Sequence, residues 1–342
     1  MSSVLWNWKE IFCIISNWIS PAKHTCYHVF IFFCCFAVLA GQAQNAQPTF
    51  KIIPLGVLGG GDESNLSAYM VAPANSDDYI CLDAGTLRFG IGLAVDHKIL
   101  FGQPLQILRR QIKGYVISHP HLDHVAGLVL NSPDDTSKNI YGLPFCLDIL
   151  KEDYFTWKGW ANFADQGDKP VLNKYHYRVL EPNKEIPLEN TGMFVEAFKL
   201  SHGNPYQSTA FLIRYQGAYL LYLGDTGADP VEKSDDLAQL WQRVGGLIKS
   251  KQLKAIFIET SFPDEQPTAQ LFGHLTPALL QNEMLALSEF SSTDALINFP
   301  IVITHIKATT PGIGETIRKE LLNHNTLHLQ VIFAGQATPL NF

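Results

Sequence analysis

Ser118-His119-Pro120-His121-Leu122-Asp123-His124 is the stretch of sequence that decides the fold. It places three imidazoles and a carboxylate within six positions, directly after the apolar run Gly114 to Ile117, which predicts a strand. Neutral imidazole and carboxylate are favoured ligands of zinc, and a turn from a strand into a helix lets such side chains converge. Four candidate ligands in this order are rare by chance, so a solvated loop with incidental histidines is the weaker interpretation. We therefore predict that this loop serves two adjacent divalent metal ions.

Three further candidate ligands follow other predicted strands. His202 comes after the run 194–200, Asp225 after 218–223 and His305 after 301–304. Each alone would be a weak signal, because a single histidine after a strand is more often a surface or core residue. Together with the loop they supply seven candidate ligands, enough for two metal sites.

The fold is predicted from short apolar runs rich in β-branched residues, which are typical of strands. They cover residues 51–58, 69–72, 79–82, 114–118, 194–200, 209–215, 218–223, 255–258 and 301–304. Helices are predicted over 230–249, over 278–287 after Thr276-Pro277, and from Thr310-Pro311 to Leu322. Strands in both halves, with helices to cover them, predict an α/β fold: an αββα sandwich of two packed mixed sheets flanked by helices.

Composition and charge limit the partners. The chain has 342 residues, of which 46% are hydrophobic and 17% charged, and its formal net charge is -7. Acidic and basic residues are interspersed without a Lys/Arg stripe, so the electrostatic footprint of a protein that binds long nucleic acids is missing. A small anionic substrate would need positive charge within its own site.

The first 43 residues have the layout of a signal peptide. Val29 to Ala40 is a continuous apolar run, preceded by Lys23 and followed by Gly41-Gln42-Ala43, which has small residues where a signal peptidase cleaves. The run is shorter than the ~18 apolar residues of a membrane-spanning helix, so a permanent anchor is the weaker alternative. We expect residues 1–43 to be removed, residues 44–342 to form a single domain, and the protein to be periplasmic or secreted.

Two cysteines, Cys81 and Cys146, remain in the predicted mature chain. They are too few for a disulfide framework and are not spaced as a zinc knuckle. We predict that both are buried as small apolar side chains, with a single disulfide between them as the alternative.

The ordered motifs resemble those of the metallo-β-lactamase superfamily. The resemblance covers the His-Pro-His-Leu-Asp-His loop, the three later ligands and the earlier Leu82-Asp83-Ala84-Gly85. It implies that Asp225 bridges two metal ions and that Asp83 supports the metal-binding loop without touching metal. The implied ligands are His119, His121 and His202 for one ion, and Asp123, His124 and His305 for the other.

Within that superfamily the chain is similar to the class II cyclic-nucleotide phosphodiesterases. The loop continues to Asn131-Ser132-Pro133 as in that family, and the matches extend from about Leu55 to Lys307. They include Gly59-Gly60-Gly61 with Glu63 and Asn65, Ile258-Glu259-Thr260-Ser261-Phe262, Gly273-His274-Leu275-Thr276, and Thr304-His305-Ile306-Lys307.

The expected activity is hydrolysis of 3',5'-cyclic nucleotides, cAMP first and cGMP second, to nucleoside 5'-monophosphates. Two zinc ions with Asp123, Asp225 and a bridging hydroxide carry a net positive charge, which suits a phosphodiester monoanion, and the hydroxide is the expected nucleophile. Iron or manganese can occupy similar ligand sets. The alternatives are another hydrolase of this fold, acting on a different phosphodiester, a sulfate ester or a β-lactam, and a non-catalytic binding protein. The oligomeric state is left open.

Several roles are predicted outside the metal ligands. Asp123 and His274 are the expected catalytic residues, and His274 would protonate the departing 3' oxygen, with a structural histidine as the alternative. Asn65, His274 and Lys307 are candidate substrate-binding residues, and Glu259, like Asp83, a supporting one. Trp157, Trp160 and Phe163 are either an aromatic wall for a nucleobase or, more commonly for such residues, buried against the domain.

Overall fold

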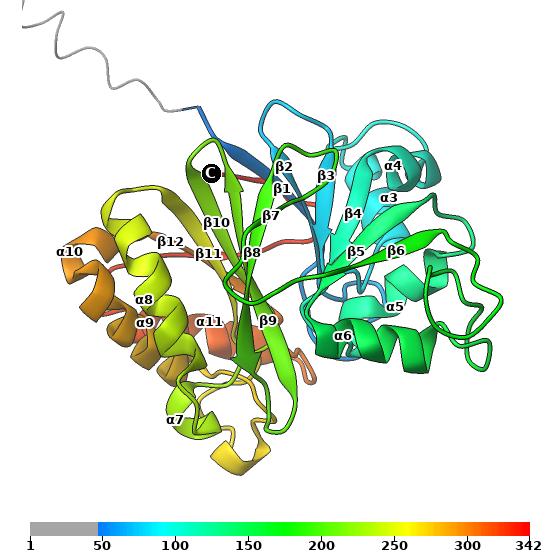
Figure 1. Ribbon diagram of the computed structural model, residues 1–342. Coiled ribbons are helices and arrows are strands. Elements are labelled where there is room, and N and C mark those ends of the chain that lie inside the picture. The colour runs from blue at the N-terminus through cyan, green and yellow to red at the C-terminus, as the bar shows by residue number, and fades with distance from the viewer. Residues whose placement is uncertain (1–46) are drawn as a thin grey trace, which may run out of the picture. The chain divides into compact units, whose positions relative to one another are not determined.

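The computed structural model describes residues 47–342, and Pro48–Phe342 form one compact unit. Two seven-stranded sheets lie at its centre (Figure 1). The predicted signal peptide, residues 1–43, lies outside the described residues.

The first sheet has the strand order β14-β1-β2-β3-β4-β5-β6. β1, β2 and β3 are antiparallel neighbours, whereas β3, β4, β5 and β6 run parallel. Because parallel strands end at the same edge, the loops that follow β3 and β4 leave from one edge of this sheet. The strands are β1 (Phe50–Gly56), β2 (Ala68–Pro73), β3 (Tyr79–Leu82), β4 (Ile112–Val116), β5 (Lys138–Gly142), β6 (Tyr175–Val179) and β14 (Leu340–Asn341).

The second sheet has the order β13-β12-β11-β10-β9-β8-β7. β10 to β13 are parallel, and β9 is antiparallel to both β8 and β10. β8 therefore points the same way as β10, β11 and β12, so all four end at one edge. The strands are β7 (Ile186–Pro187), β8 (Phe194–Ser201), β9 (Gln207–Tyr215), β10 (Ala218–Leu223), β11 (Leu253–Glu259), β12 (Pro300–Thr304) and β13 (Gln330–Phe333).

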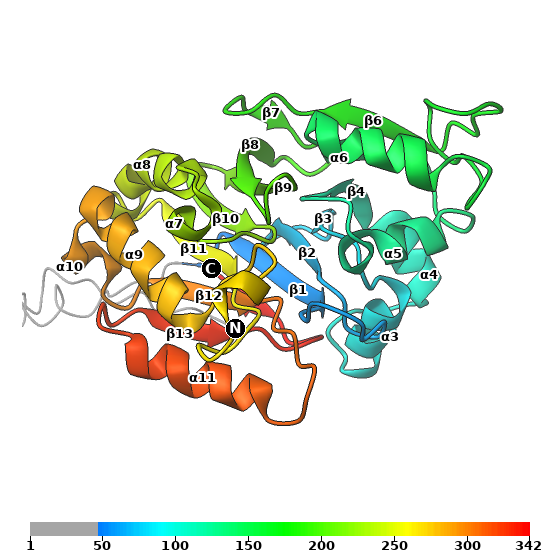
Figure 2. The ribbon, with the colours of Figure 1, turned by 90° about the horizontal axis from the view of Figure 1, so that it is seen from below.

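Helices cover the outer face of each sheet (Figures 1 and 2). The first sheet is covered by α3 (Arg88–Asp96), α4 (Pro104–Arg110), α5 (Leu122–Asn131), α6 (Pro144–Ile149) and the π-helical turn η2 (Leu150–Tyr154). The second sheet carries α7 (Asp229–Glu232), α8 (Asp236–Lys249), α9 (Pro277–Ser291), α10 (Thr293–Leu296) and α11 (Ile313–His324), and a short turn, η3 (Thr268–Gln270), precedes α9.

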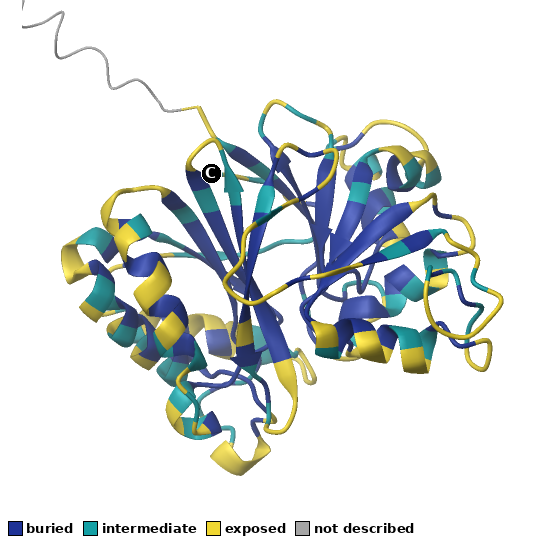
Figure 3. Cartoon of the chain, viewed as in Figure 1, coloured by how far each residue is buried: buried dark blue, intermediate teal, exposed yellow. Residues whose placement is uncertain are grey.

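Three apolar clusters hold these layers together. One lies between the two sheets, where the Tyr69 ring is 5.7 Å from the rings of Tyr222 and Phe257. The other two fill the spaces between each sheet and its helices. The central strands of each sheet are buried on both faces for this reason, while the helices keep one exposed side (Figure 3). The predicted αββα sandwich is confirmed.

The structure corrects several predicted elements. The helix predicted over 230–249 is two helices, because Lys233 adopts a left-handed conformation (φ 57°) between α7 and α8. The helix predicted from Thr310-Pro311 begins only at Ile313, after Gly312 with φ 93°. β5 was not predicted, because its polar first residues hid it; Lys138 is buried there, where its ammonium pairs with Asp135. β6, β7, β13 and β14 also fall outside the predicted strands.

Cys81 and Cys146 are both buried and both free, so the alternative of a disulfide between them is wrong. Burial raises the pKa of both thiols, which keeps them protonated and inert. Within residues 47–342, none of the helices combines the length and the apolar character that crossing a membrane requires.

Candidate metal centre

The seven predicted ligands converge where the strands of the two sheets end. His119 and His121 lie in the loop after β4, and Asp123 and His124 lie in the first turn of α5. The second sheet contributes the other three at its strand ends: His202 directly follows β8, Asp225 comes two residues after the end of β10, and His305 directly follows β12.

One group of imidazoles has a spacing that suits a shared ion. His121 Nδ1 lies 3.1 Å from His119 Nε2 and 3.3 Å from His202 Nε2. Nitrogens that bind one tetrahedral zinc at ~2.0–2.1 Å lie about 3.3 Å apart. The three ring nitrogens therefore form a metal-compatible group, of which His121 is the exposed member.

A second group consists of Asp123, His124 and His305, and Asp225 lies between the two groups. His305 Nε2 is 3.2 Å from Asp123 Oδ2 and 3.2 Å from Asp225 Oδ2. Asp225 also lies 3.4 Å from His124 Nε2 and 3.6 Å from His119 Nε2. One carboxylate thus faces a histidine of each group, the position that a bridging ligand requires.

The donor set fits divalent metal on a separate ground. His124 Nε2 is buried and has no hydrogen-bond partner in the protein, although it points toward Asp225. Buried polar atoms without a hydrogen-bond partner are rare in folded proteins, and a bound ion accounts for this one. Imidazole and carboxylate donors grouped in this way suit zinc and other divalent ions of similar preference.

Neighbouring groups orient most of the imidazoles. His124 Nδ1 lies 2.8 Å from Asp83 Oδ2, and His202 Nδ1 lies 2.9 Å from the carbonyl oxygen of Gly273. The Nδ1 atoms of His119 and His305 lie 3.0 Å from the hydroxyls of Ser118 and Ser261. With Nδ1 engaged in this way, each of these rings directs Nε2 toward the centre. Only His121 faces it with Nδ1.

Asp83 lies beneath the loop and connects it to both sheets. Its Oδ1 accepts from the Ser118 amide at 2.7 Å, and its Oδ2 accepts from the Ser118 hydroxyl at 2.8 Å and the Tyr222 hydroxyl at 2.6 Å, besides His124. Asp83 is fully buried and has φ 52°, as His305 has φ 57°. Left-handed conformations of non-glycine residues store strain, and such residues cluster at functional sites.

The pKa values in the centre favour neutral rings on one side and a charged carboxylate in the middle. Burial would raise the pKa of Asp225, but the imidazoles of His305 and His124 hold it well below its ordinary value. Burial and the neighbouring His124 lower the pKa of His119, and burial with His202 lowers that of His121 to about 4. Neutral imidazole is the form that binds metal.

Glu259, His274 and Lys307 form a chain of contacts beside the centre. His274 Nδ1 lies 2.8 Å from Glu259 Oε1, and the Lys307 ammonium donates to His274 Nε2 across 2.8 Å. Ser261 joins Glu259 to His305, since its hydroxyl donates to Glu259 Oε2 at 2.7 Å. Burial lowers the pKa of His274 to about 4, while burial and the charge on Asp225 raise that of Glu259 to about 7.

Asn65 and the glycines after β1 shape the segment that packs against the candidate ligands. Asn65 Oδ1 accepts a hydrogen bond from the Val57 amide at 2.9 Å. A Cβ on Gly59 would lie 2.2 Å from the His305 ring, so only glycine permits this close approach. The Gly60 amide donates to Asp123 Oδ2 at 3.0 Å. The backbone here therefore packs against two candidate ligands.

The three predicted aromatic residues lie away from the centre. Trp160 donates to the Ser132 hydroxyl at 2.9 Å, and it packs with Phe163 against the core of the first sheet. Trp157 is 44% exposed and donates to the carbonyl oxygen of Pro170 at 2.8 Å. None of them is among the residues that line the two described cavities beside the candidate ligands. An aromatic wall made of these residues is therefore not what the structure shows.

Sequence reasoning missed several supporting residues. Ser118 and Ser261 lie within the motifs 118–124 and 258–262, so the sequence did place two hydroxyls beside candidate ligands. Tyr222 lies within an apolar strand, and no pattern indicates that its hydroxyl reaches Asp83. Tyr206, 6.0 Å from His121 between ring centroids, was also missed.

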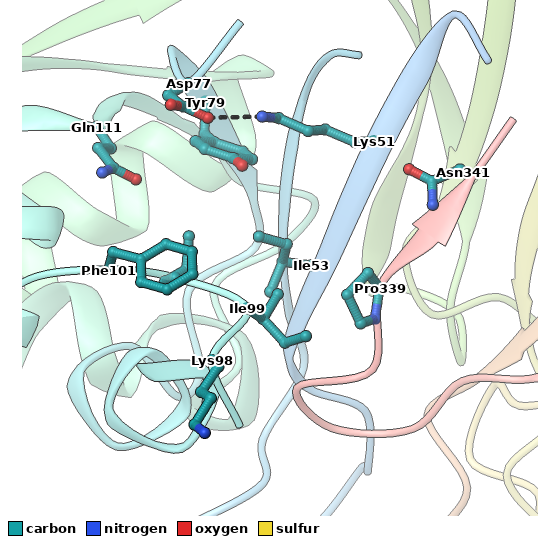
Figure 4. Close-up of a pocket in the computed structure, with 11 residues that line it drawn as sticks. Lys51, Ile53, Asp77, Tyr79, Lys98, Ile99, Phe101, Gln111, Pro339 and Asn341 are labelled. Carbon is teal, nitrogen blue, oxygen red and sulfur yellow. Dashed lines mark hydrogen bonds and ion pairs between the residues drawn. The ribbon is translucent and has the colours of Figure 1, made fainter. Parts of the chain in front are cut away.

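Two cavities flank the centre and another lies far from it. A cavity of about 290 Å³ includes His119 and His121 in its wall, and one of about 350 Å³ is lined by residues 58–62 with Ala308 and Thr309. A cavity of about 530 Å³ contains Tyr79, which begins β3, whereas Asp83 follows the other end of that strand (Figure 4). In that distant cavity the Lys51 ammonium is bound by Asp77 at 2.6 Å.

Fold and centre together define a class: a protein of the metallo-β-lactamase fold with a His/Asp centre suited to metal. The structure superposes on unliganded yeast PDE1 with a TM-score of 0.76 and 25% identity, covering 86% of this chain and 100% of that one. The metallo-β-lactamase fold protein YhfI from Bacillus subtilis, at 16% identity and a TM-score of 0.58, shares the fold over 86% of this chain and 99% of that one.

Sequence comparisons narrow the class to a family. The model of the class II cAMP phosphodiesterases matches residues 102–328. A 3',5'-cyclic-nucleotide phosphodiesterase of Aliivibrio fischeri is 36% identical over 91% of this chain and 98% of its own. A probable 3',5'-cyclic-nucleotide phosphodiesterase of Yersinia pestis is 35% identical, over 86% of this chain and 89% of its own. The chain belongs to the class II cAMP phosphodiesterase family.

Proposed function

We propose that this protein hydrolyses 3',5'-cyclic nucleotides to nucleoside 5'-monophosphates at a centre of two zinc ions. One observation carries the proposal: two metal-compatible groups of ligands lie side by side, with the Asp225 carboxylate between them. His119, His121 and His202 would hold one ion, and Asp123, His124 and His305 the other. Membership of the phosphodiesterase family supports the substrate class.

When bound, the two ions would supply an activated water for attack on phosphorus and neutralise charge on the phosphoryl oxygens. The chain's own residues do the rest. Asp123 and Asp225 give the centre only two negative charges among the proposed ligands, so a phosphodiester monoanion is attracted without a basic surface. Asp83 holds the loop in place from below through the contacts with Ser118 and His124.

We assign the departure of the 3' oxygen to the pair of His274 and Lys307. An alkoxide leaves poorly unless a proton reaches it. Glu259 holds His274 through Nδ1, so Nε2 is the nitrogen turned toward the Lys307 ammonium. Because Nε2 accepts from Lys307, the proton at this contact is carried by the ammonium. Passed from Lys307 through His274 Nε2, that proton would reach the leaving oxygen, and the ammonium would also bind phosphate. We also propose that Asn65 takes part in substrate binding, as part of the segment after β1 that its side chain holds through the Val57 amide.

The test is turnover of 3',5'-cAMP by purified protein, with and without a chelator, alongside elemental analysis. We expect about two zinc ions per chain and turnover that disappears on chelation and returns with added zinc. A folded protein that binds no metal, or one that leaves cAMP intact while cleaving a β-lactam or a sulfate ester, would overturn the proposal.

We also propose that residues 1–43 direct export, on the basis of their charged start, apolar run and small-residue end. N-terminal sequencing of protein recovered from cell fractions should then begin near Gln44, in a periplasmic or secreted fraction. Recovery of chains that still start at Met1 in the cytoplasm would contradict this.

A further inference from the structure

The cavity of about 290 Å³ beside His119 and His121 is the one flanking cavity among those described that has an aromatic wall. We propose that it binds the purine base of the substrate, with Tyr206 as the stacking residue and Gln207 as the residue that reads the edge of the base. This inference rests on the proposed function and adds the residues that set its base specificity.

The position of the cavity follows from its shared wall. His119 and His121 are candidate ligands of one ion and also line the cavity, so a phosphate held at the centre places the rest of a nucleotide at the cavity mouth. His121 is exposed toward it, and the centroid of its ring lies 6.0 Å from that of Tyr206.

The wall is built by three separate parts of the chain. One is the loop from His119 to His121. The second is the continuous segment of α6 and η2, which supplies Phe145, Ile149 and Tyr154, and the third holds Tyr206, between β8 and β9. Tyr154 is fixed, because its hydroxyl donates to the carbonyl oxygen of Pro120 at 2.8 Å. Tyr206 is 64% exposed, so the face of its ring is available to a ligand. A flat base fits such a wall, since every base has a face that stacks on an aromatic ring.

The opposite cavity does not offer this. Its wall is formed by Leu58, Gly59-Gly60-Gly61, Asp62, Ala308 and Thr309, with no aromatic ring and with a carboxylate at one side. Its backbone is also committed to the centre through the Gly60 contact with Asp123. The difference between the two cavities fixes the direction in which the nucleotide lies.

Gln207 is the amide in the aromatic cavity. Its side chain is exposed, and its backbone pairs with Ser201 at the start of β9. An amide both donates and accepts, so by rotation it matches either the N6 amino group and N1 of adenine or the N1–H and O6 of guanine. The wild-type protein therefore accepts both bases, whereas a carboxylate at this position would accept only and would select guanine.

The experiment measures binding of the product nucleotides to the zinc-loaded protein by calorimetry, which needs no turnover. In Tyr206→Ala, affinity for 5'-AMP should fall about 10-fold, and Tyr206→Trp should restore it. Ribose 5-phosphate, which has no base, should bind all variants equally. Gln207→Glu should raise the ratio of 5'-GMP to 5'-AMP affinity about 10-fold. Phe101→Ala, an exposed aromatic in the distant cavity, is the matched control and should change nothing.

The outcomes separate this inference from the proposed function. If wild-type protein hydrolyses cAMP but Tyr206→Ala binds 5'-AMP as before, the inference is wrong and the function stands. Equal losses for 5'-AMP and ribose 5-phosphate would show that Tyr206 acts on the phosphate or the metal, and metal analysis would report the latter. If Gln207→Glu leaves the ratio of 5'-GMP to 5'-AMP affinity unchanged, Gln207 does not contact the edge of the base. If wild-type protein turns over no cyclic nucleotide, the proposed function fails first.

Discussion

The two sheets contribute to the centre in different ways. The first supplies four candidate ligands from one loop and the turn after it, within the six residues from His119 to His124. The second supplies His202, Asp225 and His305 from three strand ends that are far apart in the chain. The loop can be recognised as a local pattern, whereas the three single residues acquire a role only when β8, β10 and β12 end side by side.

The support of the ligands differs in the same way. Asp83 alone binds Ser118 twice and His124 once, so one buried carboxylate holds much of the loop. His202 and His305 each have a partner of their own, a backbone carbonyl and a serine hydroxyl. Removing the supporting side chain should therefore disturb several candidate ligands on the first sheet, but only one candidate ligand on the second.

The largest effect is expected for Asp225→Ala, because this carboxylate lies between both groups. Losing it should remove several kcal/mol of transition-state stabilisation and lower kcat on cAMP by about 10³-fold, with loss of bound metal. Kinetics and elemental analysis check this. Asp134→Ala is the control, since Asp134 makes an exposed ion pair with Arg88 and should change neither reading. Full metal content in Asp225→Ala would show that each group holds its ion unaided.

His274→Ala tests whether the second sheet also provides the proton. Loss of a positioned acid should cost roughly 10²- to 10⁴-fold in kcat on cAMP, but much less on a bis-nitrophenyl phosphodiester, whose nitrophenolate leaves without help. Metal content should stay at the wild-type level. Equal losses on the two substrates would mark His274 as a phosphate binder. Unchanged rates would leave it a structural histidine.

Asp83→Asn tests the shared support of the first sheet. An amide cannot accept the hydrogen bonds of Ser118, Tyr222 and His124 together, so metal affinity or activity should fall about 10- to 100-fold. Competition with a chromogenic chelator measures the affinity of both ions. If only one ion is weakened, the loop is held by more than this carboxylate.

Ser261→Ala tests the single support of His305 and should have the smallest effect. The hydroxyl lies 3.0 Å from His305 Nδ1, and its loss leaves the ring without this partner, at a cost of about 10-fold or less in the affinity of one ion. The same chelator titration should show one affected ion and one unaffected ion. Weakening of both ions by a similar factor would abolish the contrast between the sheets.

The close approach of the sheets explains why the centre needs both. A Cβ on Gly224, directly before Asp225, would lie 2.4 Å from the Ser118 side chain. Tyr222 reaches from β10 to Asp83, and Thr209 donates to the Ser118 carbonyl oxygen at 2.8 Å. These contacts place the ligand loop of one sheet against the strand ends of the other.

The sequence by itself determined the sandwich and indicated which residues meet. Apolar runs of strand length identified nine of the strands, since burial on both faces demands continuous apolar residues. The loop from His119 to His124 indicated the candidate metal centre, because four of its candidate ligands lie within six residues. Strands with polar residues, such as β5, were not predicted from the sequence. Lys138 can be buried there only because its ammonium pairs with Asp135.

Only the tertiary structure decided the distances between the candidate ligands, the side chains that support them and the residues that line the cavities beside them. Three contacts depend on strands and loops that come together from distant parts of the chain. They are the hydrogen bond from Tyr222 to Asp83, the contact of Lys307 with His274, and the packing of Tyr206 near His121. It also placed Trp157, Trp160 and Phe163 away from the centre and put a different aromatic wall beside it. Local sequence patterns report periodicity along one segment, whereas contacts between segments follow from how whole layers pack.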